Sequence, residues 1–250
     1  MTNFLKILAK SLIKNWVRSL GLEIVRSENA HFTLEGHLKN ALSHYEIDCV
    51  IDVGANIGSY GRLLRRIGYA GWIISFEPIR SVFNQLQSDA NEDPRWICYN
   101  CAIGESETFQ ELNVYGSSVF SSFLKVSTLS LSKWNALDNY QSELVQVKKL
   151  DNVIEEIVTL TKARNYFLKS DTQGYDLEVF RGATNCLPLV RILQSEICFI
   201  ETYEGMKNPL DMMREYNHSG FLLSGFYPVN RDDSLGVIEA DCIFVKSGGH

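Results

Sequence analysis

Residues 49–59 read CVIDVGANIGS, a short apolar run followed by a glycine-containing loop. The run at 49–53 predicts a buried strand, and a helical pattern begins at residue 60. In open α/β sheets, ligands bind outside the carboxyl ends of the strands. Gly54 allows a tight turn with no Cβ toward a ligand, and Gly58 allows the next helix to approach closely. The stretch therefore predicts a strand, a ligand-binding loop and a helix.

The rest of the chain alternates short apolar runs with helical patterns, which is typical of βαβ units. Strands are predicted at 49–53, 72–76, 96–101, 166–170, 192–197, 221–227 and 237–245, and helices at 60–67, 80–90, 177–186 and 210–216. The last two strands are too close in sequence for a parallel crossover, so they are expected to be antiparallel. The predicted fold is α/β: a doubly wound, mainly parallel, seven-stranded, Rossmann-like sheet that ends in an antiparallel hairpin.

The predicted domain spans residues 48–246, followed by a short tail at 247–250. Residues 104–150 are rich in Ser and Asn and break the alternation, which predicts an insertion over the ligand edge of the sheet. Residues 1–47 are predicted to form a helical extension. Its first 20 residues form a basic amphipathic pattern with cations at every fourth position, Lys6, Lys10, Lys14 and Arg18.

Two interpretations of this amphipathic helix remain. It packs its apolar face on the main domain, or it makes a peripheral contact with anionic lipid at the inner membrane surface. The regularly spaced cations interrupt any long apolar stretch, so neither a signal peptide nor a membrane span is predicted. We expect a cytoplasmic protein.

Composition and charge narrow the class of partner. A chain of 250 residues that is 45% hydrophobic and 22% charged suits one large globular domain. Its net charge of -6 argues against nucleic acid as a partner, because binding to a phosphate backbone needs clustered Lys and Arg. The six cysteines are scattered, and Cys98 and Cys101 form a lone CxxC without a second pair, so free thiols are predicted. The sequence leaves the oligomeric state open.

The next predicted strand ends at Phe76-Glu77-Pro78, which places a carboxylate where it can accept both hydroxyls of a ribose. A nicotinamide dinucleotide would use the same acid, but its loop normally reads GxGxxG to admit a pyrophosphate. The loop here lacks the middle glycine. S-adenosylmethionine has no phosphate, and its ammonium and sulfonium charges favour loop carbonyls and the Asp52 carboxylate. Ala102 and Ile103, after the third strand, are placed to flank the adenine.

Residues 168–183, LKSDTQGYDLEVFRGA, place Asp171 just past the fourth predicted strand. Together with DVGANIG, FEP and the closing EADCIFV, this run resembles the FkbM-type methyltransferase family, in which such segments recur in this order. The resemblance covers about residues 48–246. It departs from the family at Asp176, where a glutamate is usual, although Glu178 follows two residues later.

The resemblance implies a class I methyltransferase fold and S-adenosylmethionine-dependent O-methylation of a hydroxyl on a sugar, glycan or other small molecule. Asp171 is the candidate general base, because removal of the hydroxyl proton assists the transfer. Lys169 lies on the same side of the strand and can orient it; a structural ion pair is the alternative. The candidate cofactor-binding residues are Asp52, Gly54, Asn56, Gly58, Glu77, Ala102 and Ile103, and the candidate substrate contacts are Ser121, Gln173 and Glu178.

Three alternatives accompany this prediction. A divalent metal could use oxygen ligands from Asp171, Asp176, Glu178 and Glu196, but no metal site is predicted. An NAD(P)-dependent oxidoreductase is disfavoured by the loop and the final hairpin. A binding module without turnover is disfavoured because Asp52, Glu77 and Asp171 are all present.

Overall fold

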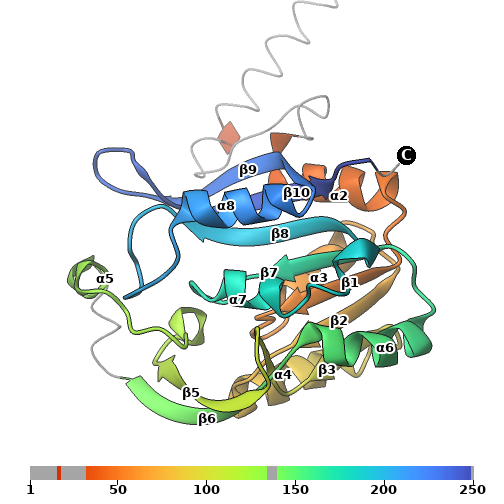
Figure 1. Cartoon of the computed structure of the whole chain (residues 1–250), viewed down its shortest axis with the longest axis horizontal. Coiled ribbons are helices and arrows are strands. Elements are labelled where there is room, and N and C mark those ends of the chain that lie inside the picture. Colours follow the sequence, from red (N-terminus) through yellow and green to blue (C-terminus); the bar gives the residue numbers. More distant parts are fainter. Residues whose placement is uncertain (1–15, 18–31, 134–139, 249–250) are drawn as a thin grey trace, which may run out of the picture. The chain divides into compact units, whose positions relative to one another are not determined.

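The computed structural model describes residues 16–17, 32–133 and 140–248 (Figure 1). The chain divides into two compact units, Met1–Leu38 and Lys39–His250, and the boundary falls within helix α2 (Leu34–His44). The amphipathic helix expected in the first 20 residues lies almost wholly outside the described residues, so it stays a prediction. The following description concerns the second unit.

A sheet with the order β3-β2-β1-β7-β8-β10-β9 forms the centre of this unit (Figure 1). Strands β1, β2, β3, β7 and β8 are parallel, whereas β10 is antiparallel to both β8 and β9. This confirms the doubly wound, mainly parallel sheet with a final antiparallel hairpin. The bounds are β1 (Cys49–Val53), β2 (Trp72–Phe76), β3 (Trp96–Tyr99), β7 (Tyr166–Ser170), β8 (Val190–Cys198), β9 (Phe221–Arg231) and β10 (Val237–Lys246).

Helices cover both faces of the sheet (Figure 1). On one face, α6 (Leu150–Thr161), α7 (Asp176–Arg181) and α8 (Pro209–His218) share an apolar core with alternate residues of β1, such as Ile51 and Val53. On the other face lie α3 (Ser59–Arg66) and α4 (Arg80–Ala90). A Cβ added at Gly61 of α3 would stand 2.2 Å from the Trp96 ring, so the backbone of α3 packs tightly against this side chain of β3. The sequence analysis did not predict α6.

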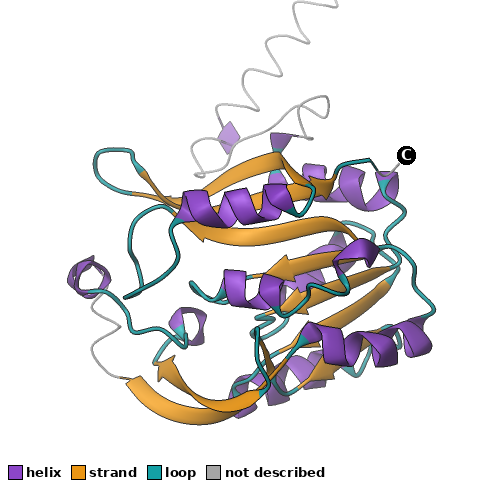
Figure 2. Cartoon of the chain, in the orientation of Figure 1, coloured by secondary structure: helices purple, strands orange, loops and turns teal. Residues whose placement is uncertain are grey.

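The region predicted as an insertion, 104–150, forms a smaller sheet together with the two residues that precede it (Figure 2). Its strands are β4 (Ala102–Ile103), β5 (Thr108–Tyr115) and β6 (Tyr140–Lys148), in the order β4-β6-β5, with β5 and β6 antiparallel. Between β5 and β6 lie the 3-10 turn η2 (Ser118–Phe120) and helix α5 (Thr128–Lys133). Residues Leu112, Ser118 and Phe123 from this region line the pocket described below, so the region borders the ligand edge of the main sheet.

The direction of winding reverses between β1 and β7. From β1 the sheet continues to β2 and β3, and from β7 it continues to β8. Val53 pairs with Phe76 on one side and with Ser170 on the other, so the residues that follow these three strands emerge together. Gly54, Glu77 and Asp171 therefore meet at the point where open α/β sheets bind ligands.

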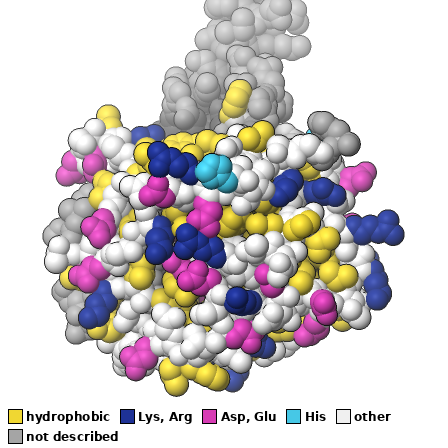
Figure 3. Space-filling view, viewed as in Figure 1, with side chains coloured by type: hydrophobic (Ala, Val, Ile, Leu, Met, Phe, Trp, Pro, Cys, Tyr) yellow, Lys and Arg dark blue, Asp and Glu magenta, His cyan; other side chains and the backbone are white. Residues whose placement is uncertain are grey.

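Figure 3 shows Lys and Arg interspersed with Asp and Glu over the visible face, without a single basic patch. All six cysteines are free. Within the part of the chain that the structure describes, no helix is both long enough and apolar enough to cross a membrane.

Candidate active site

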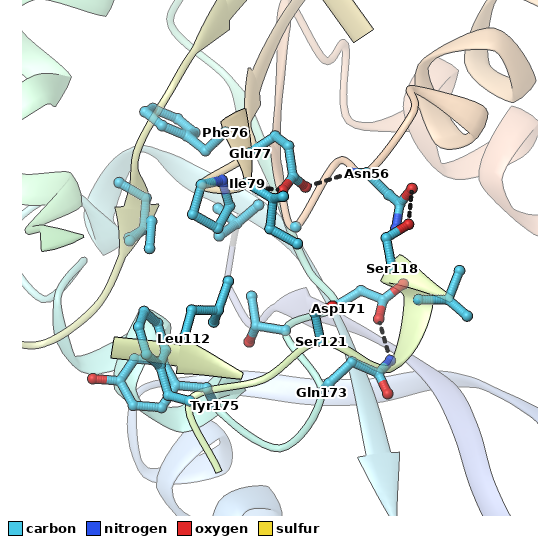
Figure 4. A pocket seen from close by; sticks show the side chains of 18 residues that line it. Asn56, Phe76, Glu77, Ile79, Leu112, Ser118, Ser121, Asp171, Gln173 and Tyr175 are labelled. Atoms are coloured by element: carbon cyan, nitrogen blue, oxygen red, sulfur yellow. Dashed lines mark hydrogen bonds between the residues drawn. The ribbon is translucent and has the colours of Figure 1, made fainter. Parts of the chain in front are cut away.

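A pocket of about 710 Å³, including open space at its mouth, lies at this reversal point (Figure 4). The predicted site residues that line it are Gly54, Asn56, Glu77, Ala102, Ile103, Ser121, Asp171 and Gln173. Phe76, Ile79, Leu112 and Tyr175 add apolar walls that the sequence analysis did not predict. An apolar pocket with a few convergent polar groups is the usual form of a small-molecule site.

The loop after β1 has the geometry expected from its glycines. Gly54 has a φ of 75°, and a Cβ there would stand 2.0 Å from the backbone oxygen of Asp171. Gly58 has a φ of 82°, and its Cβ would meet Leu86 Cδ1 at 2.8 Å. Gly58 was also predicted as a cofactor contact, but it is absent from the pocket lining, and its missing Cβ lets the start of α3 pack closely against Leu86 and Trp96. Asn56 also adopts a left-handed conformation, with a φ of 49°.

Glu77 is a buried carboxylate at the pocket wall, only 4% exposed. Its Oε2 accepts a hydrogen bond from the backbone N–H of Asn56 at 2.9 Å, and its Oε1 accepts one from Ile79 at 2.8 Å (Figure 4). Burial raises the pKa of Glu77 to about 7, although the two N–H donors act in the opposite direction. The side chain is thus fixed in position with lone pairs left for a ligand.

Lys169 lies between two carboxylates. Its Nζ is 3.1 Å from Asp52 Oδ1 and 3.5 Å from Asp171 Oδ2, and it donates a hydrogen bond to the backbone oxygen of Gly54 at 3.3 Å. Burial lowers the pKa of Lys169, but the Asp52 and Asp171 carboxylates outweigh this effect and raise it overall. Asp52 is fully buried, and neither Asp52 nor Lys169 is among the residues that line the pocket. The two side chains thus support the loop and Asp171.

Asp171 faces the pocket, and both of its carboxylate oxygens have partners. Gln173 Nε2 donates to Asp171 Oδ1 at 3.0 Å, opposite the contact of Lys169 with Oδ2 (Figure 4). The Asp171 side chain is 37% exposed, so a substrate can reach it. The Gln173 amide is itself oriented, because Tyr203 Oη donates to its Oε1 at 2.8 Å. The sequence analysis did not predict this tyrosine.

The two acids on α7 lie away from the pocket lining. Glu178, a predicted substrate contact, is mostly buried, and its Oε1 lies 3.6 Å from Lys207 Nζ. Asp176 is 1% exposed and accepts hydrogen bonds from the backbone N–H and the hydroxyl of Thr172. Burial, with repulsion from Asp171, raises the pKa of Asp176 to about 7. Asp176 therefore holds the turn that leads from Asp171 into α7.

Residues 118–122 connect the two sides of the pocket. Ser118 exchanges hydrogen bonds with the Asn56 side chain at 3.0 and 3.1 Å (Figure 4). Ser122 Oγ donates to the backbone oxygen of Gln173 at 2.7 Å. Ser121 lines the pocket between these two anchors, and its Oγ accepts a hydrogen bond from the Tyr115 N–H. The segment thus joins the loop after β1 to the loop after β7.

The sequence matches the Methyltransferase FkbM domain over residues 52–223. The chain belongs to the FkbM methyltransferase family. This membership confirms the S-adenosylmethionine-dependent methyltransferase predicted from the motifs. The residues present fit the cofactor, because Glu77 offers an anchored carboxylate at the pocket wall, and the close approach of Gly54 to the Asp171 backbone brings the loops after β1 and β7 together at the pocket. No curated protein sequence matches the chain.

Solved structures that are similar to this chain include the following three, each at low sequence identity. The magnesium protoporphyrin IX methyltransferase ChlM from Synechocystis PCC 6803, with bound SAM, is 11% identical, with 95% of this chain and 97% of that chain covered and a TM-score of 0.45. An uncharacterized protein from Listeria monocytogenes serotype 4b is 10% identical, with 86% and 69% covered and a TM-score of 0.46. The human methyltransferase 10 domain containing protein is 10% identical, with 95% of each chain covered and a TM-score of 0.44.

The pKa of Glu77 predicts pH-dependent cofactor binding. The ionised carboxylate accepts two hydroxyl hydrogen bonds, whereas the protonated form loses acceptor capacity. Because the pKa of Glu77 is about 7, affinity is expected to rise with pH through that value. If only the ionised form binds, the gain from one pH unit below the pKa to one above it is about tenfold. Calorimetric titration of S-adenosylmethionine over this range measures the change.

Glu77→Gln is the control for that measurement, because it removes the titrating group and keeps the side-chain size. The variant should bind more weakly and should lose most of the pH dependence. A wild-type and a variant curve with the same slope would assign the titration to another group.

Proposed function

We propose that this FkbM-family protein transfers the methyl group of S-adenosylmethionine to a hydroxyl oxygen of a sugar, glycan or other small molecule. The observation that carries the proposal is the position of Asp171. It is an accessible carboxylate in the cofactor pocket, held by Lys169 and Gln173. A hydroxyl acceptor needs a base of this kind near the transferred methyl.

In this proposal, the pocket divides into regions for the parts of the cofactor. Glu77 accepts hydrogen bonds from the ribose hydroxyls. Ala102 and Ile103 flank the adenine, together with the apolar side chain of Ile79. Gly54 and Asn56 lie beside the methionine portion, and the Asn56 side chain is held in place by Ser118. Asp52 acts indirectly, since its carboxylate holds Lys169 against the loop.

When bound, S-adenosylmethionine supplies a methyl group on a positively charged sulfur. Asp171 accepts the hydroxyl proton while the acceptor oxygen bonds to the methyl carbon, and the electron pair of the broken carbon–sulfur bond stays on sulfur. Lys169 and Gln173 keep the carboxylate in one orientation, which matters because in-line transfer depends chiefly on positioning. Ser121 and Gln173 are the proposed substrate contacts, and Glu178 receives no role because it lies outside the pocket.

Thermal unfolding with each cofactor tests the cofactor class. A ligand that binds only the folded state at a hundredfold excess over its Kd raises the melting temperature by roughly 5–10 °C in a chain of this size. We expect such a rise with S-adenosylmethionine and none with NAD. A rise with NAD alone would overturn the assignment. Transfer of labelled methyl to small-molecule hydroxyls then distinguishes turnover from binding alone.

A further inference from the structure

A second cavity shares a wall with the cofactor pocket. It encloses about 370 Å³, part of it open to solvent, and Gln173 lines both spaces. Tyr203 and Glu239 line the second cavity, and Tyr203 holds the Gln173 amide that in turn contacts Asp171. A molecule in this cavity is therefore separated from Asp171 by a single side chain.

Three carboxylates from β8 and β10 lie at or beside this cavity. Asp241 pairs directly with Glu196 in the sheet, and Glu239 lines the cavity itself. Each carboxylate is held by a neutral amide rather than by a cation: Glu196 by Gln173, Glu239 by Asn230 and Asp241 by Gln194. The cluster is thus ordered by hydrogen bonds from neutral amides and not by salt bridges.

The surroundings of these carboxylates disfavour their charged forms. Burial raises the pKa of Glu196, and repulsion from Asp171 and Glu239 raises it further. Burial, with repulsion from Asp171, also raises the pKa values of Glu239 and Asp241, although Lys169 acts in the opposite direction on Asp241. Among the residues that the structure describes, none of these three carboxylates forms a salt bridge, and the nearby Lys169 pairs with Asp52 and Asp171. Carboxylates kept in such surroundings are typical of functional sites.

We propose that this cavity is the acceptor subsite and that the acceptor carries an ammonium group beside the hydroxyl that is methylated. The inference rests on the proposed function. The ammonium group supplies the opposite charge that Glu239 and Glu196 lack, while the hydroxyl end of the acceptor extends past Gln173 into the cofactor pocket, where Asp171 lies. Amino sugars and other amino alcohols have both groups, whereas a carboxylate or phosphate on the acceptor would be repelled.

A divalent cation is the competing occupant. Ligand atoms of Glu196, Cys198 and Glu239 lie within 4.8 Å of one another. A thiol must ionise to bind a metal ion, but burial, with repulsion from Glu196, raises the pKa of Cys198. An ammonium group needs only carboxylate oxygens, which makes it the better match.

The test compares three trisaccharides of different charge. Each trisaccharide is titrated calorimetrically into the full-length protein saturated with S-adenosylhomocysteine. The three are cellotriose, trigalacturonate, and chitotriose with its amines protonated. We expect chitotriose to bind ~10-fold or more tightly than cellotriose, because a charge-assisted contact is added. Trigalacturonate should not bind. Glu239→Gln should remove most of the preference for chitotriose, and the exposed Glu92→Gln should not change it.

The outcomes separate this inference from the proposed function. If S-adenosylhomocysteine binds but chitotriose has no advantage, or none of the three trisaccharides binds, the inference is overturned and the methyltransferase assignment stands. If S-adenosylhomocysteine itself fails to bind, the proposed function fails. Binding of Mn²⁺ to the dialysed protein that is lost in both Glu239→Gln and Cys198→Ala would show a metal site and overturn the ammonium proposal.

Discussion

Asp171→Asn is expected to lower the turnover of methyl transfer by ~100-fold or more while leaving the affinity for S-adenosylmethionine nearly unchanged. An amide keeps the size of the side chain, and its oxygen can still accept a hydrogen bond from Gln173 or Lys169. It cannot accept the hydroxyl proton. The effect should therefore fall on kcat and spare cofactor binding, which calorimetry and single-turnover assays measure separately.

The exposed Asp211→Asn on α8 provides a control with the same carboxylate-to-amide change far from the pocket lining. It should retain full turnover. Unchanged turnover in Asp171→Asn would remove Asp171 from the role of base. A large loss of cofactor affinity in Asp171→Asn would instead assign it to binding.

Lys169→Met is expected to lower the free energy of unfolding by about 3–5 kcal/mol, because it leaves the buried Asp52 carboxylate without its cation. Asp52 has no solvent exposure, and Ser75 Oγ, at 3.3 Å, is a weak replacement. Methionine fills a volume similar to that of lysine, so the substitution leaves no large cavity, and lost packing contributes little to the change in unfolding free energy. Equilibrium unfolding in urea measures the change.

The double variant Asp52→Asn with Lys169→Met separates charge from packing. Both partners are then neutral, so the double variant should recover at least half of the stability lost in Lys169→Met. A double variant less stable than Lys169→Met, or a loss below about 1 kcal/mol in Lys169→Met, would contradict a buried ion pair.

The central sheet and much of the pocket could be predicted from sequence because parallel register converts sequence position into spatial position. Gly54, Glu77 and Asp171 each follow a predicted strand, and strands of one parallel sheet end at the same edge. The predicted and observed strands differ mainly in the residues at which they begin and end, as in β8 and β9. The local alternation of apolar and polar residues does not define where the pairing between strands stops.

Two features were missed for different reasons. Helix α6 has buried residues at helical spacing, Leu150, Val153, Ile154 and Ile157, so its pattern was present in the sequence and was overlooked at the edge of the insertion. By contrast, the approach of Tyr203 and Glu239 to Gln173 depends on how β10 pairs with β8 and on the path of the chain after β8. No local pattern encodes that approach.

The position of Asp52 follows from strand parity. Asp52 alternates with Val53, and it pairs in register with Ser75 and Lys169, whose side chains share its face of the sheet. It was predicted as a cofactor contact, but the structure places it among these residues, outside the pocket lining. The same parity rule applied to the neighbouring strands would have suggested the ion pair with Lys169.

Gln173 connects parts of the molecule that would otherwise vary independently. Its side chain contacts Asp171 and Tyr203, and its backbone oxygen accepts a hydrogen bond from Ser122 in the insertion. A change in the insertion is therefore expected to alter both the space for an acceptor and the orientation of Asp171, the proposed base. A change of acceptor preference by design is therefore expected to need substitutions both in the insertion and around Tyr203, rather than in the insertion alone.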